Sequence, residues 1–377
     1  MSLQPRPEVK KLKASIHGGI NYAELKAAGF APEDIHDFSV CTNPFMPPPG
    51  LKKALGTVAI DRYPDSESIE LRQRLSEKLK ITPDNILVGS GTTELIRLIA
   101  LTYFSPGDRV LLLEPTFGDY EISCQIVGAE LIKQQIRTED GFTPDLKETV
   151  SLIRQHRAKG VFICNPNNPT GKYLSRQEIE AVLSAGENTL LILDEAYLAF
   201  TGNTWPAIDL IPQGNVVILR SMTKDYALAG LRLGYAIANQ EIISNLRRVR
   251  PPWNVNAAAQ KAGIIALDEA KHLNSSQIKI EEAKQFLIVE LSKLGFRPLP
   301  SDTNFFLMRV GDVRGFRTAL LKHGILVRDC TSFGLPEYVR IAPRPIPACR
   351  KLISALKMLK LTETDNRNMM IKSRLYL

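Results

Sequence analysis

Short apolar runs recur along the chain between about residues 85 and 240, and stretches with helical spacing separate them. The runs read ILVGS, VLLLEP, VFICNP, LLILDEAY, VVILRS and GYAIA. Continuous apolar runs bounded by turn residues are typical of strands buried on both faces, and their alternation with helices favours parallel pairing. This rhythm predicts an α/β fold, in which a mainly parallel sheet lies between helices and functional groups gather at the strand ends.

The flanks of this region have a different pattern. A chain of 377 residues exceeds the roughly 250–300 residues at which a single core tends to split. After about residue 265 a long charged amphipathic helix (276–294) precedes the shorter runs FFLMRV, ILVRD and YVRIA. We therefore predict a large domain over residues 51–262 and a smaller α+β domain over 263–361. Residues 1–50 are expected to join the small domain, and residues 362–377 to form a loosely held polar tail.

Composition and charge exclude several classes of protein. With 44% hydrophobic and 23% charged residues the chain is globular, and it has no apolar run near the ~20 residues that cross a bilayer. The N-terminus does not resemble a signal peptide, so we expect a cytoplasmic protein without a membrane partner. The net charge of +8 comes from scattered basic residues, which argues against nucleic acid. Five cysteines, widely separated and never in CxxC spacing, indicate reduced thiols and no metal site.

The segment GSGTTEL, Gly89 to Leu95, follows one predicted strand and opens a helix. Backbone N–H groups at such a helix start can receive a phosphate. The segment is not a dinucleotide fingerprint, because Glu94 stands where the third glycine would be, and it lacks the GK[ST] of a P-loop. A plain helix cap by Thr92 or Thr93 is the alternative.

Polar residues also follow the next two strands. NPNNPTG, Asn165 to Gly171, ends one strand, and LLILDEAY places Asp194 and Tyr197 at the end of another. An aspartate in an apolar run is costly unless it has a cationic or hydrogen-bonding partner, and a protonated pyridine nitrogen is such a partner. A helix cap or a surface salt bridge is the alternative for Asp194.

The stretch RSMTKDYALAGLRLGY, Arg220 to Tyr235, is the most specific indication of the kind of reaction that this chain supports. Two hydroxyls, Ser221 and Thr223, and the guanidinium of Arg232 bracket Lys224 in the sequence. This set suits a dianionic phosphate beside a reactive amine. An isolated lysine is usually a solvated surface cation, but the preceding strand and the small-residue turn after it indicate a built site.

The ordered series GSGTTE, PTFGDY, NPNNPTG, DEAY and SMTK-x7-R resembles the fold type I enzymes that depend on pyridoxal 5'-phosphate (PLP). Within them the chain resembles the aminotransferase group that contains histidinol-phosphate aminotransferase and its relative L-threonine-O-3-phosphate decarboxylase. The resemblance covers nearly all of residues 15 to 360. It implies a large domain with a mixed, mainly parallel sheet, a smaller domain, and PLP as the cofactor.

Carried over position by position, the resemblance implies that Lys224 holds PLP as a Schiff base and acts as a general base. It implies that Asp194 pairs with the pyridinium nitrogen, while Asn168 and Tyr197 contact the O3' atom of the ring. Phe117 would stack on the ring, where the aminotransferases usually have tyrosine. The implied phosphate-binding residues are Gly91, Thr92, Ser221, Thr223 and Arg232.

Tyr63, in RYPD, resembles the tyrosine that these enzymes lend to the neighbouring subunit's cofactor phosphate. The resemblance therefore implies a homodimer. On the substrate side Arg340 is assigned to an α-carboxylate and Arg328 to a side-chain phosphate, because a guanidinium can bind either group bidentately. Arg344 is a possible helper, and Asn43 matches a family position near the substrate. Basic residues that flank strands also commonly face solvent, which is the alternative for the arginines.

Three features bear on the reaction. IHGG, with His17 and Gly18, resembles the segment that covers the substrate phosphate in threonine-phosphate decarboxylases; Thr223 precedes the lysine where the aminotransferases more often have serine; and PPWNVN is similar to a decarboxylase segment. We expect L-threonine-O-3-phosphate decarboxylase, which forms the aminopropanol phosphate of the cobalamin side chain. The alternative is a histidinol-phosphate aminotransferase or related transaminase using 2-oxoglutarate. A non-catalytic PLP-fold binding protein and a nucleotide-binding dehydrogenase are more distant alternatives.

Overall fold

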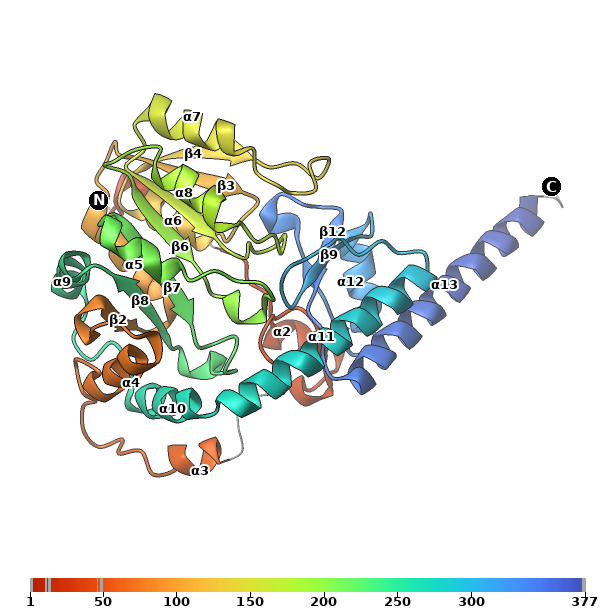
Figure 1. Cartoon of the computed structure of the whole chain (residues 1–377). Helices are drawn as coiled ribbons and strands as arrows, with labels where there is room; N and C mark the ends of the chain where they lie inside the picture. The colour runs from red at the N-terminus through yellow and green to blue at the C-terminus, as the bar shows by residue number, and fades with distance from the viewer. Residues whose placement is uncertain (1–2, 11, 13–14, 46, 48–49, 375–377) are drawn as a thin grey trace.

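A computed structural model describes residues 3–10, 12, 15–45, 47 and 50–374 (Figure 1). Its centre is a seven-stranded sheet with the strand order β2-β8-β7-β6-β5-β3-β4. The strand β8 runs antiparallel to both of its neighbours, and the other pairs are parallel. The strands are β2 (Ile86–Gly89), β3 (Arg109–Glu114), β4 (Glu130–Gln135), β5 (Gly160–Cys164), β6 (Leu190–Asp194), β7 (Val216–Ser221) and β8 (Gly234–Ala238). The predicted α/β class, with a mixed and mainly parallel sheet, is confirmed.

Six of the seven strands coincide with the apolar runs, and β4 does not. Its sequence ELIKQQ is mostly polar, and only one of its six positions is fully buried, whereas β2 at the other edge of the sheet is buried throughout. Gln134 is nonetheless buried, and it donates to the backbone oxygen of Asp145 and accepts from the hydroxyl of Thr149. The pattern of apolar residues could not reveal a strand whose inward polar side chain is satisfied in this way.

Two hydrophobic clusters cover the two faces of this sheet. Successive residues of each strand alternate between the clusters; Leu112 belongs to one, and Leu111 and Leu113 belong to the other. One face is covered by α5 (Gly91–Tyr103), α6 (Asp119–Ile126) and α9 (Gln240–Val249). The other is covered by α3 (Leu51–Leu55), α4 (Ile69–Leu79), α7 (Leu146–His156), α8 (Arg176–Leu183) and α10 (Ala257–Asp268).

The C-terminal part of the chain forms a smaller α+β unit. Its antiparallel sheet has the order β11-β12-β9, with β9 (Phe306–Arg309), β11 (Arg328–Asp329) and β12 (Tyr338–Ile341). The helices α11 (Ala270–Lys293), α12 (Val313–Leu321) and α13 (Ile346–Arg374) complete it. The predicted strand ILVRD is divided, because Val327 separates β10 (Ile325–Leu326) from β11.

The N-terminal segment contacts this smaller unit. It contains α1 (Pro7–Lys10), α2 (Tyr22–Ala28) and β1 (His36–Asp37), and β1 pairs in parallel with β10. Phe38 packs into the hydrophobic cluster formed by α11, α12, α13 and β12. In contrast, α1 lies against α6, and Arg6 donates to the backbone oxygen of Ile126 at 2.9 Å. The assignment of residues 1–50 to the small domain and the domain boundaries therefore stay predictions.

Two helix ends differ from the sequence-based expectation. The helix α11 begins at Ala270, six residues before the predicted start at 276. The helix α13 continues to Arg374, so residues 362–374 extend it in place of the loose tail that we expected (Figure 1). No proline or glycine occurs between residues 350 and 374 to end this helix, which explains the difference. Residues 375–377 lie outside the described residues.

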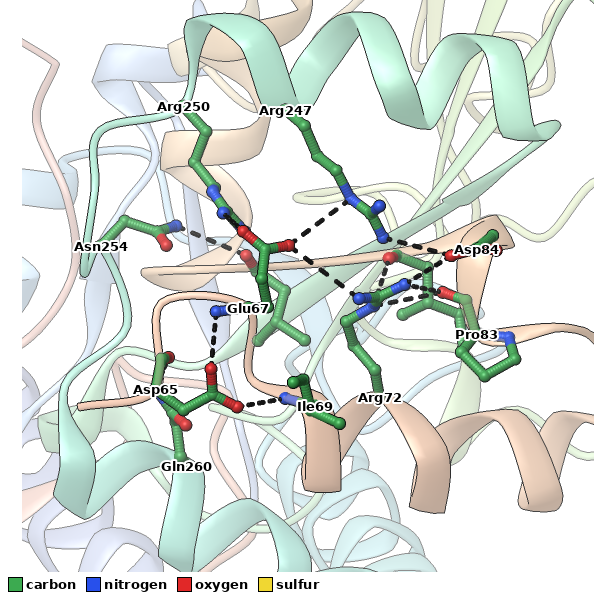
Figure 2. A network of polar contacts seen from close by, with 12 residues as sticks. Asp65, Glu67, Ile69, Arg72, Pro83, Asp84, Arg247, Arg250, Asn254 and Gln260 are labelled. Atoms are coloured by element: carbon green, nitrogen blue, oxygen red, sulfur yellow. Dashed lines mark hydrogen bonds and ion pairs between the residues drawn. The ribbon is translucent and has the colours of Figure 1, made fainter.

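A network of charged side chains connects α4, α9 and the short 3-10 helix η2 (Pro83–Asn85), as Figure 2 shows. Glu67 accepts a hydrogen bond from Arg250 and lies within 4.0 Å of Arg72 and Arg247. Asp84 accepts from Arg72 at 3.0 Å and lies 3.8 Å from Arg247. Three guanidinium groups therefore share two carboxylates beside the start of α4.

Among the described residues, none of the helices is both long and apolar enough to serve as a membrane span. All five cysteines are free and buried. The same residues contain no group of three or more His, Cys, Asp or Glu side chains that could bind a metal ion.

Candidate active site

A cavity of about 660 Å³ opens at the carboxyl ends of β5, β6 and β7. Its wall joins the large sheet to the N-terminal segment and to the small sheet. It brings together most of the predicted site residues: His17, Gly18, Thr92, Phe117, Asn168, Asp194, Tyr197, Ser221, Thr223, Lys224, Arg232, Arg328 and Arg340.

One loop carries both Lys224 and Arg232 to this cavity. The loop leaves β7 at Ser221 and returns to β8 at Gly234, and a backbone hydrogen bond from Met222 to Leu233 closes it at 3.1 Å. The hydroxyl oxygens of Ser221 and Thr223 lie 2.7 Å apart. Two hydroxyls, an amine and a guanidinium thus face one end of the cavity, as the sequence predicted.

The start of α5 leaves room for the guanidinium of Arg232. Gly91 has a φ of +76°, and a Cβ atom there would lie 2.7 Å from Arg232 Nη2. A side chain at this position would therefore displace the guanidinium, and its backbone conformation would be strained. Gly91 is absent from the cavity wall itself, while Thr92 and Thr93 belong to it. The helix start, Arg232 and the hydroxyls fit a phosphate group.

The amine of Lys224 lies in a largely desolvated environment. Burial is the main cause that lowers its pKa, and the positive charges of Arg340 and Arg232 lower it further. Its nitrogen lies 5.9 Å from the ring centroid of Tyr197. Across the described part of the chain we find no hydrogen bond or ion pair from this amine. A larger neutral fraction at a given pH makes Lys224 a better nucleophile and base.

Asp194 ends β6 with its carboxylate buried under the cavity. Tyr120 donates to Asp194 Oδ2 at 2.7 Å, and the backbone N–H of Ala196 donates to Oδ1 at 3.0 Å. Burial raises the pKa of Asp194, whereas these two hydrogen bonds favour its ionised form. Because Asp194 is buried, the surface salt bridge considered from the sequence is wrong, whereas the bond from Ala196 is a capping contact. A buried carboxylate of this kind suits a cationic ring nitrogen.

Phe117 and Tyr120 come from the same segment, PTFGDY. Phe117 lies on the cavity wall, with its ring centroid 5.5 Å from that of Tyr120 in an edge-to-face arrangement. Sequence reasoning assigned only Phe117. The hydroxyl of Tyr120 could have been suspected from its spacing of three residues after Phe117, which places both side chains near one end of α6.

Arg328 and Arg340 extend from neighbouring strands of the small sheet, where they are direct partners in the register of β11 and β12. Both are buried and both line the cavity. Arg340 donates to Asn168 Oδ1 and, at 2.9 Å, to the backbone oxygen of Ser39. Burial lowers the pKa of Arg328, and Arg340 adds to this effect. The solvent-facing alternative for these two arginines is therefore wrong.

Residues 16–19, which we call the strap, form the N-terminal side of the wall. Arg328 donates to the backbone oxygens of Ile16 and His17, the latter at 3.1 Å. The imidazole Nε2 of His17 lies 3.5 Å from Asp119 Oδ2, and its ring centroid is 5.8 Å from that of Phe117. Part of the hydrogen-bonding capacity of Arg328 is therefore used by the strap, although the sequence resemblance assigned this side chain to the substrate phosphate.

Besides Gly91, three predicted residues lie away from the cavity wall. Asn43 is buried and donates to the backbone oxygen of Asp225 at 2.9 Å and to Ser276 Oγ at 2.6 Å, so its amide connects chain segments and does not face the cavity. Tyr63 is 74% exposed, and its ring stacks on Trp253 at 4.2 Å. Arg344, the possible helper, also lies outside the wall.

Several wall residues were not anticipated from the sequence. They are mostly small or neutral side chains without a motif of their own: Ser15, Ile16, Ser39, Val40, Cys41, Thr93, Cys164, Ser332 and Phe333. Only residues close to them in the chain, such as His17 and Arg328, belong to motifs that indicated a binding site.

A mixed seven-stranded sheet, with a desolvated lysine after β7 and a buried aspartate at the end of the neighbouring strand β6, defines a PLP enzyme of fold type I. The chain matches the sequence model of the family "Aminotransferase class I and II" over residues 33–356, and it belongs to this family. Its cofactor is PLP, which the phosphate cradle at Gly91 and the buried carboxylate of Asp194 both fit.

Proteins that are similar in sequence to this chain include histidinol-phosphate aminotransferases. The one from Moorella thermoacetica is 36% identical over 318 residues, covering 82% of this chain and 81% of that protein. The one from Symbiobacterium thermophilum is 35% identical over 320 residues, covering 84% and 88%. These names favour the transaminase alternative over the decarboxylase that we expected.

Solved structures agree on the fold. The histidinol-phosphate aminotransferase from Sinorhizobium meliloti in complex with pyridoxal-5'-phosphate has a TM-score of 0.86 at 26% identity, covering 95% of this chain and 99% of that one. The L-threonine-O-3-phosphate decarboxylase from Porphyromonas gingivalis has a TM-score of 0.75 at 28% identity, covering 86% and 98%. Both reactions considered from the sequence therefore occur among structures similar to this chain.

Proposed function

We propose that this enzyme is an aminotransferase that takes the amino group of histidinol phosphate and passes it to 2-oxoglutarate. The observation that carries the proposal is the pair of buried arginines on β11 and β12. Like charges directly opposite each other in a sheet are unfavourable, so Arg328 and Arg340 call for an anionic partner. The phosphate of one substrate and the carboxylates of the other supply such partners in turn.

The residues that would hold the cofactor are those at the strand ends. The phosphate would lie against the start of α5, with Thr92, Ser221, Thr223 and Arg232 as donors. The backbone at Gly91 would approach it closely. We assign the covalent link with the cofactor to the amine of Lys224.

Asp194, Tyr197, Asn168 and Phe117 would surround the ring. The carboxylate of Asp194 would hold a proton on the ring nitrogen, and Tyr120 keeps that carboxylate in place. Tyr197 and Asn168 would hydrogen-bond the ring oxygen, and Phe117 would cover one ring face. Bound PLP supplies an electron sink that stabilises negative charge at the substrate's Cα atom.

The remaining chemistry is proton transfer by this chain. Lys224, whose lowered pKa leaves more of its amine neutral, would take the proton from Cα and return it to the cofactor carbon. Arg340 would hold the α-carboxylate of glutamate or 2-oxoglutarate, and Arg328 the phosphate of histidinol phosphate. Substrate orientation by these two arginines would determine which bond at Cα breaks.

The test is an assay of the purified protein with PLP, histidinol phosphate and 2-oxoglutarate, in which formation of glutamate is measured. We expect turnover by the wild type, and a loss of about a thousandfold or more in Lys224→Ala, together with loss of the visible absorption band of bound PLP. Lys293→Ala, which changes an exposed lysine on α11, is the matched control. Turnover that survives in Lys224→Ala would disprove the role of this lysine.

A second candidate is decarboxylation of L-threonine O-3-phosphate. Its specific support is that His17 and Gly18 lie on the cavity wall, where the sequence resemblance places them over a substrate phosphate. Release of carbon dioxide and aminopropanol phosphate from this substrate, without glutamate formation in the first assay, would establish the decarboxylase and overturn the aminotransferase proposal.

A further inference from the structure

The strap is attached to the cavity wall at a second point besides Arg328. The backbone N–H of Gly19 donates to Ser39 Oγ at 2.8 Å. Gly18 lies so close that a Cβ atom there would be 2.7 Å from the backbone oxygen of Ser39. A contact this short would force the strap or the residue beneath it to move, so the strap lies directly on Ser39.

Ser39 is itself fixed and buried, with 2% of its surface exposed. Asp37 Oδ1 accepts hydrogen bonds from its backbone N–H at 2.8 Å and from its hydroxyl at 2.6 Å. The hydroxyl therefore donates to Asp37 while it accepts from Gly19, which determines its orientation. On its other side, the backbone oxygen of Ser39 accepts from Arg340 Nη2 at 2.9 Å.

We propose that Ser39 is a positioning residue for substrate binding, because it joins the strap to the guanidinium of Arg340. Arg340 is then held at two points, by Asn168 and by Ser39. Ser39 and Arg328 together hold the strap against the cavity. Ser39 acts through these groups and takes no part in bond breaking. The inference rests on the proposed function, in which Arg340 and the strap contact an anionic substrate.

Ser39→Ala removes the acceptor of Gly19 and one of the two donors to Asp37, and it keeps the backbone oxygen that Arg340 contacts. We expect a KM for the amino substrate about tenfold higher, as for the loss of one buried hydrogen bond, with kcat within twofold of the wild type. We also expect amide hydrogen exchange at Gly19 in the holoenzyme to be at least about tenfold faster. The absorption of bound PLP should not change.

Ser123→Ala is the matched control. Ser123 is also buried, but its hydroxyl has no hydrogen-bond partner within the described chain, and it does not belong to the cavity wall. Its removal should leave KM, kcat and the exchange at Gly19 unchanged. The control separates the effect of the contact with the strap from that of removing any buried hydroxyl.

Gly18→Ala provides a second variant that pushes the strap away from Ser39 without altering Ser39 itself. It should raise KM and Gly19 exchange in the same direction, and the double variant should be little worse than either single one, because both disturb one contact. Additive effects, or unchanged KM and exchange in Ser39→Ala, would overturn the proposal. If the wild type converts neither substrate, the proposed function fails. The role of Ser39 is then decided by amide exchange at Gly19 and by the affinity of the holoenzyme for sulfate, an anion used as a probe of the site, which Ser39→Ala should weaken and Ser123→Ala should not.

Discussion

Tyr120 has a specific role, which its contact with Asp194 indicates. Its hydroxyl is buried against Asp194, and this hydrogen bond lowers the pKa of a carboxylate that burial otherwise raises. Tyr120→Phe should therefore raise the pKa of Asp194 and so favour its protonated form. We expect kcat to fall about tenfold and the free energy of unfolding to fall by about 1 kcal/mol.

Steady-state kinetics and chemical denaturation measure these two effects. Tyr22→Phe, at a tyrosine that is 71% exposed, is the control and should change neither quantity. An unchanged kcat in Tyr120→Phe would show that the hydrogen bond to Asp194 has no part in the reaction.

Asp225 gives the protein a pH dependence of stability. Burial raises its pKa to about 7, from an ordinary value of 3.8. Between about pH 4 and pH 7 the folded protein therefore keeps a proton that the unfolded chain loses. It follows that this group makes the free energy of unfolding decrease as the pH rises through this window, with no further change above it.

Asp225→Asn should remove this decrease. We expect the free energy of unfolding of the variant, relative to that of the wild type, to increase by on the order of 2 kcal/mol from pH 5 to pH 8. Denaturation of the apoprotein at both pH values measures this change. Asp140→Asn, at an exposed carboxylate, should show no such gain. An equal difference between Asp225→Asn and the wild type at both pH values would contradict the assignment.

At the scale of elements, the network of Figure 2 connects α4, α9 and η2 through two carboxylates. Glu67→Gln would remove the carboxylate partner of Arg250 and leave Asp84 as the remaining carboxylate beside Arg72 and Arg247. Glu67 is partly exposed, so the cost is smaller than for a fully buried ion pair, and we expect about 1–2 kcal/mol of lost stability. The loss should shrink at high salt, because ions screen the repulsion between the arginines.

Denaturation at low and high salt tests this expectation. Glu77→Gln removes one partner of an exposed i,i+3 pair on the same helix and should cost less than about 0.5 kcal/mol. A loss in Glu67→Gln no larger than in Glu77→Gln would mean that the network does not stabilise this part of the fold.

Elements were predictable from the sequence where burial is apolar and continuous. The strands β5, β6 and β7 are buried at every or nearly every position, so their sequences carry the signal directly. The strand β4 was missed because most of its positions are exposed or half-buried, unlike those of the other edge strand, β2. The extension of α13 was missed because polar composition suggested a loop.

The same distinction applies to the site. Lys224, Asp194 and Arg232 follow strands or occur at a spacing that a single segment reveals. Tyr120 and Ser39 act through residues 74 and 301 positions away, and no local pattern records such a contact. The position of Asn43 was misjudged for the same reason, since its partner Ser276 is 233 residues distant.

At the scale of the whole molecule, Tyr63 belongs to a group of exposed apolar side chains that includes Trp253, its stacking partner, and Ile60, three residues earlier in the chain. Ile60 is 95% exposed, and Trp253, on which Tyr63 stacks, is 45% exposed. Exposed apolar groups gathered in this way mark interaction surfaces. We propose that this surface contacts a second copy of the chain, as the sequence resemblance implies for Tyr63.

Sedimentation analysis should give a particle of twice the chain mass of 42.0 kDa. Ile60→Lys, which replaces an exposed apolar side chain three residues from Tyr63 with a charged one, should shift the protein to monomer at micromolar concentration. Leu3→Lys changes an equally exposed apolar residue elsewhere and should leave the mass unchanged. A monomeric wild type would exclude the shared role proposed for Tyr63.

The closed loop between β7 and β8 has a consequence for the order in which the binding sites form during folding. Lys224 and Arg232 reach the cavity from one short stretch whose ends are joined by a backbone hydrogen bond, whereas Arg328 meets Ile16 and His17 across more than 300 residues. Contacts between distant parts of a chain form later, because a larger loop must close. During folding the chain should therefore gain the ability to capture PLP before it gains the ability to recognise a substrate.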